Sequence, residues 1–153
     1  MAKLLIVCLG NTRRSPLAEE ILSARGATVD SAGIDVDVDT DEHELYASGS
    51  DISDNLDAVC TALDVTTPTG HSTKAVTQEL IDWADVVYGM NSEILGKLDA
   101  KFGSNAKFVA FDSASDIPDW ETYETEVGVS DDPLAWIKAE GEHIKRIADL
   151  ISI

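Results

Sequence analysis

The stretch KLLIVCLGNTRRSPL, residues 3–17, decides the fold, because an apolar run meets a turn and then a helix start. Residues 3–9 are short, apolar and bounded by turn residues, which predicts a buried strand. Ser15 and Pro16 begin a helix, since proline is well tolerated in a first helical turn. Gly26 is expected to end that helix, and residues 27–32 predict a second strand. The chain therefore opens as a strand–helix–strand unit.

The rest of the chain continues this alternation. Further strands are expected at 84–90 and 107–111, and helices at 54–63, 77–83, 92–100 and 133–151. The stretches 34–53 and 112–131 are polar and are expected to be loops for most of their length. Strands that alternate with helices predict an α/β fold: a single domain over residues 1–153, with a parallel four-stranded sheet flanked by helices on both faces. Ligands of such sheets bind beyond the carboxyl ends of the strands.

The charge balance limits the partners of this chain. It has 153 residues, with 29 Asp and Glu against 11 Lys and Arg, for a net charge of -18. Nucleic acid and anionic membranes would be repelled by this charge, so neither is an expected partner. No apolar run has membrane-spanning length, and the apolar run at residues 4–9 is too short to be expected as a signal peptide, so we expect a cytoplasmic protein. The acidic residues are spread along the chain. This favours a halophilic protein, kept soluble by its excess acid, over a protein with an acidic surface that attracts basic partners.

Two cysteines and three histidines are too few and too scattered for a metal cage, so no metal or cofactor is expected. Cys60 lies on the apolar face of a predicted helix and is expected to be a buried core residue. Cys8 instead lies at the end of the first predicted strand, which makes it a candidate nucleophile.

The loop after Cys8 has the residues of an anion site. Backbone N–H groups before a helix converge on one point, where the helix dipole adds positive charge. Gly10 and Asn11 permit the tight backbone curl, and the fork of Arg14 can bind two oxygens of a phosphate. The same positive charge favours the thiolate form of Cys8, and Ser15 can donate a hydrogen bond to its sulfur.

The stretch VCLGNTRRSPLAEE closely resembles the N-terminal signature of low-molecular-weight protein tyrosine phosphatases, V-C-x-G-N-x-C-R-S-P-x-A-E. DSAG at 30–33, GHSTKAVT at 70–77, ADVVYGMNSEIL at 84–95 and the Asp132-Pro133 pair resemble further segments of that family. Within these segments Lys74 stands in place of the family's arginine and Asn91 in place of its aspartate. The resemblance implies that Ser31 supports the loop by bonding Asn11. It also implies that the phosphate is held by Leu9, Gly10, Asn11, Thr12, Arg13 and Arg14.

By this resemblance the protein hydrolyses phosphotyrosine in phosphorylated proteins through a cysteinyl-phosphate on Cys8, with Arg14 and Ser15 assisting. Asp132 would be the general acid that protonates the leaving oxygen, as the aspartate of the family's D-P-Y motif is. An aspartate before proline is also a common helix N-cap, and the neighbouring Asp131 is the second candidate for the acid.

Three departures from the family pattern leave alternatives open. Arg13 replaces a second cysteine that can protect the nucleophile through a disulfide, and Leu134 replaces the aromatic residue of D-P-Y. Thr12 resembles the corresponding residue of phosphoarginine phosphatases in the same family, so a protein-arginine phosphatase is an alternative. A phosphoprotein-binding module without catalysis is the other, although the presence of Cys8, Arg14 and Asp132 disfavours it.

Overall fold

The computed structural model describes residues 2–8, 14–34, 60–66, 74–112 and 133–151 of the chain. Its elements alternate as the sequence predicts. In chain order they are β1 (Lys3–Cys8), α1 (Arg14–Ala24), β2 (Thr28–Gly33), α4 (Gln78–Trp83), β3 (Val86–Gly89), α5 (Ser92–Phe102), β4 (Phe108–Ala110) and α7 (Pro133–Leu150).

The four strands form one sheet in the order β2-β1-β3-β4, and every neighbouring pair is parallel. β1 lies inside the sheet, and its side chains from Leu4 to Cys8 are all buried. A nearly continuous apolar strand of this kind is expected where helices cover both faces of a parallel sheet. The edge strand β4 is short, and none of its three side chains is fully buried.

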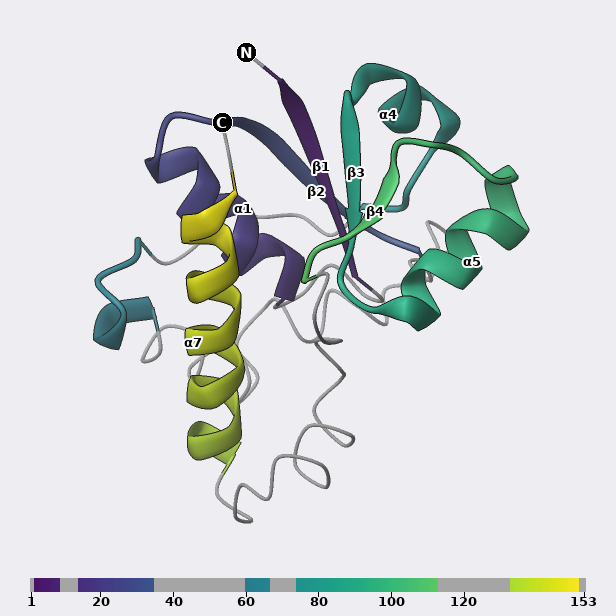
Figure 1. The fold of residues 1–153 in the computed structure, drawn as a ribbon. Coiled ribbons are helices and arrows are strands. Elements are labelled where there is room, and N and C mark those ends of the chain that lie inside the picture. Colours follow the sequence, from purple (N-terminus) through teal and green to yellow (C-terminus); the bar gives the residue numbers. More distant parts are fainter. Residues whose placement is uncertain (1, 9–13, 35–59, 67–73, 113–132, 152–153) are drawn as a thin grey trace.

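The side chains of β1 alternate between two cores, because successive residues of a strand point to opposite faces. Leu4, Ile6 and Cys8 pack in a cluster with apolar residues of α1 and α7. Leu5 and Val7 pack on the other face with residues of α4 and α5. Figure 1 shows α1 and α7 on one side of the sheet and α4 and α5 on the other. The prediction of a parallel four-stranded sheet with helices on both faces is confirmed.

Glycines end two of the helices. Gly26 follows α1 with φ of 93°, and the next residue donates its N–H to the carbonyl of Leu22 at 3.0 Å. This left-handed stop is the one that the sequence predicts. α5 continues to Phe102, two residues beyond the prediction, because its stop is Gly103 with φ of 84°.

Other element ends differ from the prediction by one or two residues. α1 begins at Arg14 rather than Ser15, and α4 begins at Gln78, after the N-cap Thr77. The strand predicted at 84–90 is β3, which starts later because Ala84 caps the C-terminus of α4. The strand predicted at 107–111 is the shorter β4.

Several expected elements fall largely on undescribed residues. Within the helix predicted at 54–63, the described residues 60–62 are helical and Leu63 lies in a turn. Cys60 is fully buried, which confirms it as a core residue. Most of the predicted loops 34–53 and 112–131 lies outside the described residues. Among the helices described, none is long and apolar enough to cross a membrane.

α1 and α7 pack alongside each other with their C-terminal ends together. The guanidinium of Arg25, just after α1, donates to the carbonyl of Ala148 and, at 2.9 Å, to that of Ile151. These carbonyl groups lie at and just beyond the end of α7, where the regular helical hydrogen bonds run out; that of Ala148 also accepts the N–H of Ile151 at 3.3 Å. The contact fixes α7 against α1, and therefore over the face of the sheet that includes Cys8.

Candidate active site

The carboxyl ends of β1 and β3 mark the place where a ligand is expected. The chain leaves β1 through α1 on one face of the sheet and leaves β3 through α5 on the other (Figure 1). Connections that diverge from adjacent parallel strands leave a crevice between them at this edge. Cys8 is the last residue of β1 and therefore lies at this point.

The sulfur of Cys8 lies 2.9 Å from the hydroxyl oxygen of Ser15, in the first turn of α1. Cys8 is 2% exposed and Ser15 is fully buried, so bulk water does not compete for this contact. Either group can donate while the thiol is neutral. Once the sulfur is ionised it can only accept, so the Ser15 hydroxyl then donates to it. The predicted contact between these two residues is present.

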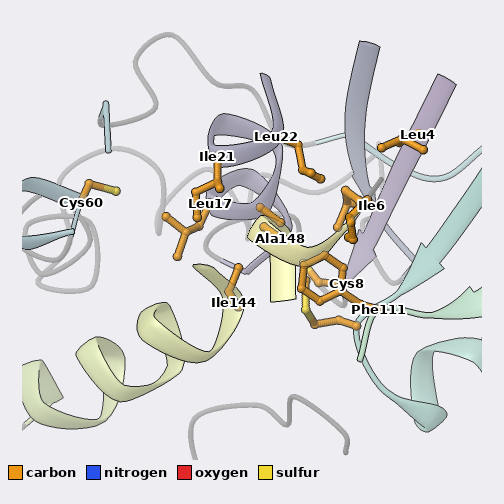
Figure 2. Packing of buried hydrophobic residues seen from close by; sticks show 13 residues of the cluster. Leu4, Ile6, Cys8, Leu17, Ile21, Leu22, Cys60, Phe111, Ile144 and Ala148 are labelled. Carbon is orange, nitrogen blue, oxygen red and sulfur yellow. The ribbon is translucent and has the colours of Figure 1, made fainter. Parts of the chain in front are cut away.

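Backbone bonds on both sides fix the end of β1. The carbonyl of Cys8 accepts from the N–H of Ile34 at 2.9 Å, and the carbonyl of Val7 accepts from Met90 at 2.9 Å. Ile34 is buried, although the polar pattern that begins there favours an exposed segment. Cys8 shares its apolar cluster with Phe111 of the β4 end (Figure 2). The thiol is therefore held on a rigid strand end.

Arg14 is the first residue of α1 and is only 5% exposed. An arginine is seldom buried to this extent unless its charge is compensated by a partner. Its position places a permanent positive charge at the N-terminal end of a helix, where the helix dipole is also positive. Five residues separate Cys8 from this end of α1, which can attract an anion.

Ser31 is fully buried in β2, opposite Ile6 of β1 in the strand register. Its backbone N–H donates to the carboxylate of Asp30 at 2.8 Å. The predicted bond from Ser31 to Asn11 stays a prediction, because Asn11 lies outside the described residues. The other predicted site residues outside the described part of the chain are Leu9, Gly10, Thr12, Arg13 and Asp132.

Two substitutions within the family-like segments have a structural explanation. Lys74 places its ammonium 2.5 Å from the carboxylate of Asp30 on β2. Asn91 caps α5 by accepting the N–H of Ile94 on its side-chain oxygen at 3.0 Å. Asparagine is as good an N-cap as aspartate, so Asn91 keeps the capping function that an aspartate would have there.

A part-buried polar pair near the site was not predicted. The Nε2 atom of His143, on α7, lies 2.8 Å from the carboxylate of Asp112, just after β4. The two side chains are 12% and 8% exposed. Glu140, one turn before His143, is 1% exposed. The pair joins residues 31 positions apart in the sequence, so no local pattern indicates it.

Tyr88 of β3 is a half-buried phenol beside an aromatic neighbour. Its ring meets that of Phe111 edge to face, with centroids 6.0 Å apart. Burial raises the pKa of the Tyr88 phenol above its ordinary value of 10.0, because the phenolate loses its hydration. Tyr88 is thus a neutral aromatic residue at neutral pH.

A cavity of about 650 Å³ lies at the outer edge of β2, away from Cys8, with Asp30, Lys74, Leu80 and Trp83 among its lining residues. Neither Cys8, Arg14 nor Ser15 lines it. Within the described ranges, no group of three or more histidine, cysteine, aspartate or glutamate residues could hold a metal ion. The described polar groups at the carboxyl end of β1 are the thiol of Cys8, the hydroxyl of Ser15 and the guanidinium of Arg14.

Comparison with known proteins gives one family match. Residues 3–151 match the family model described as low molecular weight phosphotyrosine protein phosphatase. A sequence comparison with curated proteins gave no match.

Three solved structures are similar to this chain over most of its length. YwlE arginine phosphatase from Geobacillus stearothermophilus is 24% identical with a TM-score of 0.72, and the match covers 97% of this chain and 89% of that one. Wzb from Vibrio vulnificus, in complex with benzylphosphonate, is 22% identical with a TM-score of 0.76, covering 97% and 95%. The tyrosine phosphatase AmsI from Erwinia amylovora is 19% identical with a TM-score of 0.74, covering 97% and 90%. At these identities the likeness establishes a shared fold.

Proposed function

The chain belongs to the low molecular weight phosphotyrosine protein phosphatase family and is a hydrolase, and we propose that it dephosphorylates phosphotyrosine in proteins through a cysteinyl-phosphate on Cys8. The observation that carries the proposal is the contact of 2.9 Å between the Cys8 sulfur and the Ser15 hydroxyl. It joins a strand-end thiol to the first turn of a helix that begins with a buried arginine.

In the first step the thiolate of Cys8 attacks phosphorus, and the bond from phosphorus to the tyrosyl oxygen breaks. The leaving oxygen takes a proton from a carboxylic acid, for which Asp132 is the candidate and Asp131 the second choice. The products are the cysteinyl-phosphate, the free tyrosine and the carboxylate of the acid. Without the proton a phenolate would have to leave, which is slower.

In the second step the same carboxylate removes a proton from water, whose oxygen attacks phosphorus. The sulfur leaves as a thiolate and inorganic phosphate is released. The acid is protonated again and ready for the next turnover. The Ser15 hydroxyl donates to the departing sulfur, so its stabilisation is greatest when the negative charge returns there. One acid thus serves both steps, and no metal or cofactor takes part.

A protein of net charge -18 still needs local positive charge to bind a phosphate dianion. We propose that Arg14 and the N-terminal dipole of α1 supply it, together with the backbone N–H groups of residues 9–14. Arg13 adds a second guanidinium to the same loop. Because charges more than about 10 Å away are screened at 0.1 M salt, these near groups outweigh the acidic remainder of the surface.

Hydrolysis of para-nitrophenyl phosphate tests this function. The wild type is expected to release nitrophenol, and Cys8→Ala to release none above background. Cys60→Ala is the matched control, because it makes the same change at the chain's other cysteine, which lies in the core. Turnover that survives in Cys8→Ala would remove the mechanism. A wild type that binds a phosphopeptide without cleaving it would be a binding module instead.

Phosphoarginine is the second candidate substrate. Thr12 in the loop resembles the phosphoarginine phosphatases of the family, and one of the similar structures is named an arginine phosphatase. An acidic surface would also suit a guanidinium-bearing substrate. Matched peptides that carry phosphotyrosine or phosphoarginine decide between the two, since we expect a larger kcat/KM for phosphotyrosine. Each assay is run at low and molar salt, because the acidic composition favours a salt-adapted protein.

A further inference from the structure

The cavity of about 650 Å³ beside β2 and α4 lies on the other face of the sheet from the nucleophile. Its lining residue Asp30 stands beside Leu5 of β1 in the strand register, and Leu5 belongs to the core under α4 and α5. Cys8 packs on the opposite face, with α1 and α7. We propose that this cavity binds a small organic cation, in which an ammonium or guanidinium group is carried on an aromatic body. The proposal does not depend on the phosphatase activity.

The apolar wall of the cavity comes from α4 and from the segment before it. Leu80 and Trp83 are partly buried, pack against the core beneath them and line the cavity, and Ala75 lines it beside them. A ligand that lies on these side chains removes apolar surface from water, which favours binding. Small-molecule sites have volumes of about 300–1,000 Å³. The cavity therefore suits a small ligand with an apolar body.

The charged groups of the cavity favour a cation. Lys74 and Asp30 form an ion pair whose side chains are 43% and 29% exposed, so their charges largely cancel. Glu79 also lines the cavity and is exposed, and no cation pairs with its carboxylate among the described residues. Residues 77–85 carry three acidic side chains and no lysine or arginine. The described lining is therefore net negative, as is the chain as a whole.

Trp83 favours a ligand that combines the charge with the ring. The face of an indole ring carries partial negative charge and attracts an ammonium or a guanidinium group. An anion would be repelled by this face and by the carboxylate of Glu79. Lys74, the cation of the lining, is already paired with Asp30, so it is a weak partner for an anionic ligand.

Backbone hydrogen bonds fix the wall that Lys74 and Ala75 form. The carbonyl of Lys74 accepts the N–H of Gly33 at 2.8 Å, and the N–H of Val76 donates to the carbonyl of Gly33 at 3.1 Å. Residue 75 thus forms a parallel bridge with the end of β2. A wall that is ordered before binding reduces the entropy cost of taking up a ligand.

The test measures the binding of tryptamine to the full chain by nuclear magnetic resonance. Amide resonances of Ala75, Glu79 and Leu80 and the indole N–H of Trp83 should shift in a saturable way, with a Kd of about 1 mM at 0.1 M salt. Indolepropionate has the same ring with the opposite charge, and we expect it to bind at least about fivefold more weakly. Saturating inorganic phosphate should leave the Kd of tryptamine unchanged, because the two sites are separate.

Four variants assign the charge and the ring. Glu79→Gln should weaken tryptamine about fivefold, whereas Glu93→Gln, the same change in the first turn of α5, should leave its Kd unchanged. Lys74→Met removes the ammonium beside Asp30 and should tighten tryptamine about threefold or more. Trp83→Leu keeps an apolar wall without the ring and should weaken tryptamine about fivefold or more.

The proposal is overturned if indolepropionate binds the cavity as tightly as tryptamine, or if no described lining residue shifts. Shifts confined to Cys8, Arg14 and Ser15, or a Kd that rises with phosphate, would assign the amine to the catalytic site instead. A capped tryptophan-lysine dipeptide that binds more tightly than tryptamine would assign the cavity to a protein partner and overturn the small ligand. Glu79→Gln changes an exposed side chain to one of the same shape, so a folded variant is available even if Trp83→Leu unfolds.

Discussion

Replacing Ser15 by alanine removes the hydroxyl that lies 2.9 Å from the Cys8 sulfur. Both groups are almost inaccessible to solvent, so water does not replace the lost donor. A hydrogen bond to a charged group contributes about 1.5–3 kcal/mol. At about 1.4 kcal/mol for each factor of ten, this corresponds to a fall in rate of about ten- to hundredfold. The fall should appear mainly in the second step, where the sulfur must leave as a thiolate.

Rapid mixing with para-nitrophenyl phosphate separates the two steps. The Ser15→Ala enzyme is expected to release a burst of nitrophenol close to one equivalent and then to turn over slowly, as the cysteinyl-phosphate accumulates. Ser23→Ala makes the same change at an exposed position of the same helix and should behave as the wild type. If Ser15→Ala keeps the wild-type steady-state rate, or loses the burst and the slow phase together, the proposed role of this hydroxyl is refuted.

Three further predictions concern stability. Gly89→Ala should lower the free energy of unfolding by about 1–3 kcal/mol in urea titrations, because its new Cβ would lie 2.7 Å from the side chain of Leu95. Gly96→Ala, which has open space in α5, should instead raise it by about 0.5–1 kcal/mol; equal effects would refute the packing argument. Since burial raises the pKa of Tyr88, the folded state binds its proton more tightly than the unfolded chain does. Stability should therefore decline as the pH rises above 10.0 and through the folded pKa, and Tyr88→Phe should remove that part of the decline. Arg25→Gln should cost about 1 kcal/mol and loosen the end of α7 in hydrogen exchange; unchanged exchange there would contradict the capping role.

The sequence was most informative where local chemistry acts alone. The apolar run from Lys3 predicts β1 because a strand buried on both faces needs no polar alternation. Gly26 predicts the end of α1 because few other residues adopt its φ of 93°. At α5 the same rule would have placed the end correctly, since Gly103 is the stop, but the expected helix ended two residues earlier.

Part of the candidate site could be predicted for the same reason. Cys8 and Ser15 are joined by a short connection, so a strand followed directly by a helix brings them together. The contact of His143 with Asp112 depends on how α7 lies over the sheet. That placement is set by tertiary packing, which a pattern of neighbouring residues does not encode. The ion pair of Lys74 with Asp30 was not predictable for the same reason.

The central claim is that Cys8 carries the phosphoryl group during turnover. Acid quenching of the enzyme during hydrolysis of para-nitrophenyl phosphate, followed by peptide mass spectrometry, tests it most directly. A phosphoryl group on the sulfur of Cys8, in excess in Ser15→Ala and lacking in Cys8→Ala, is the predicted result. Two results would contradict it in a wild type that turns over. One is a phosphoryl group on another residue, and the other is no phosphoryl group in either the wild type or Ser15→Ala.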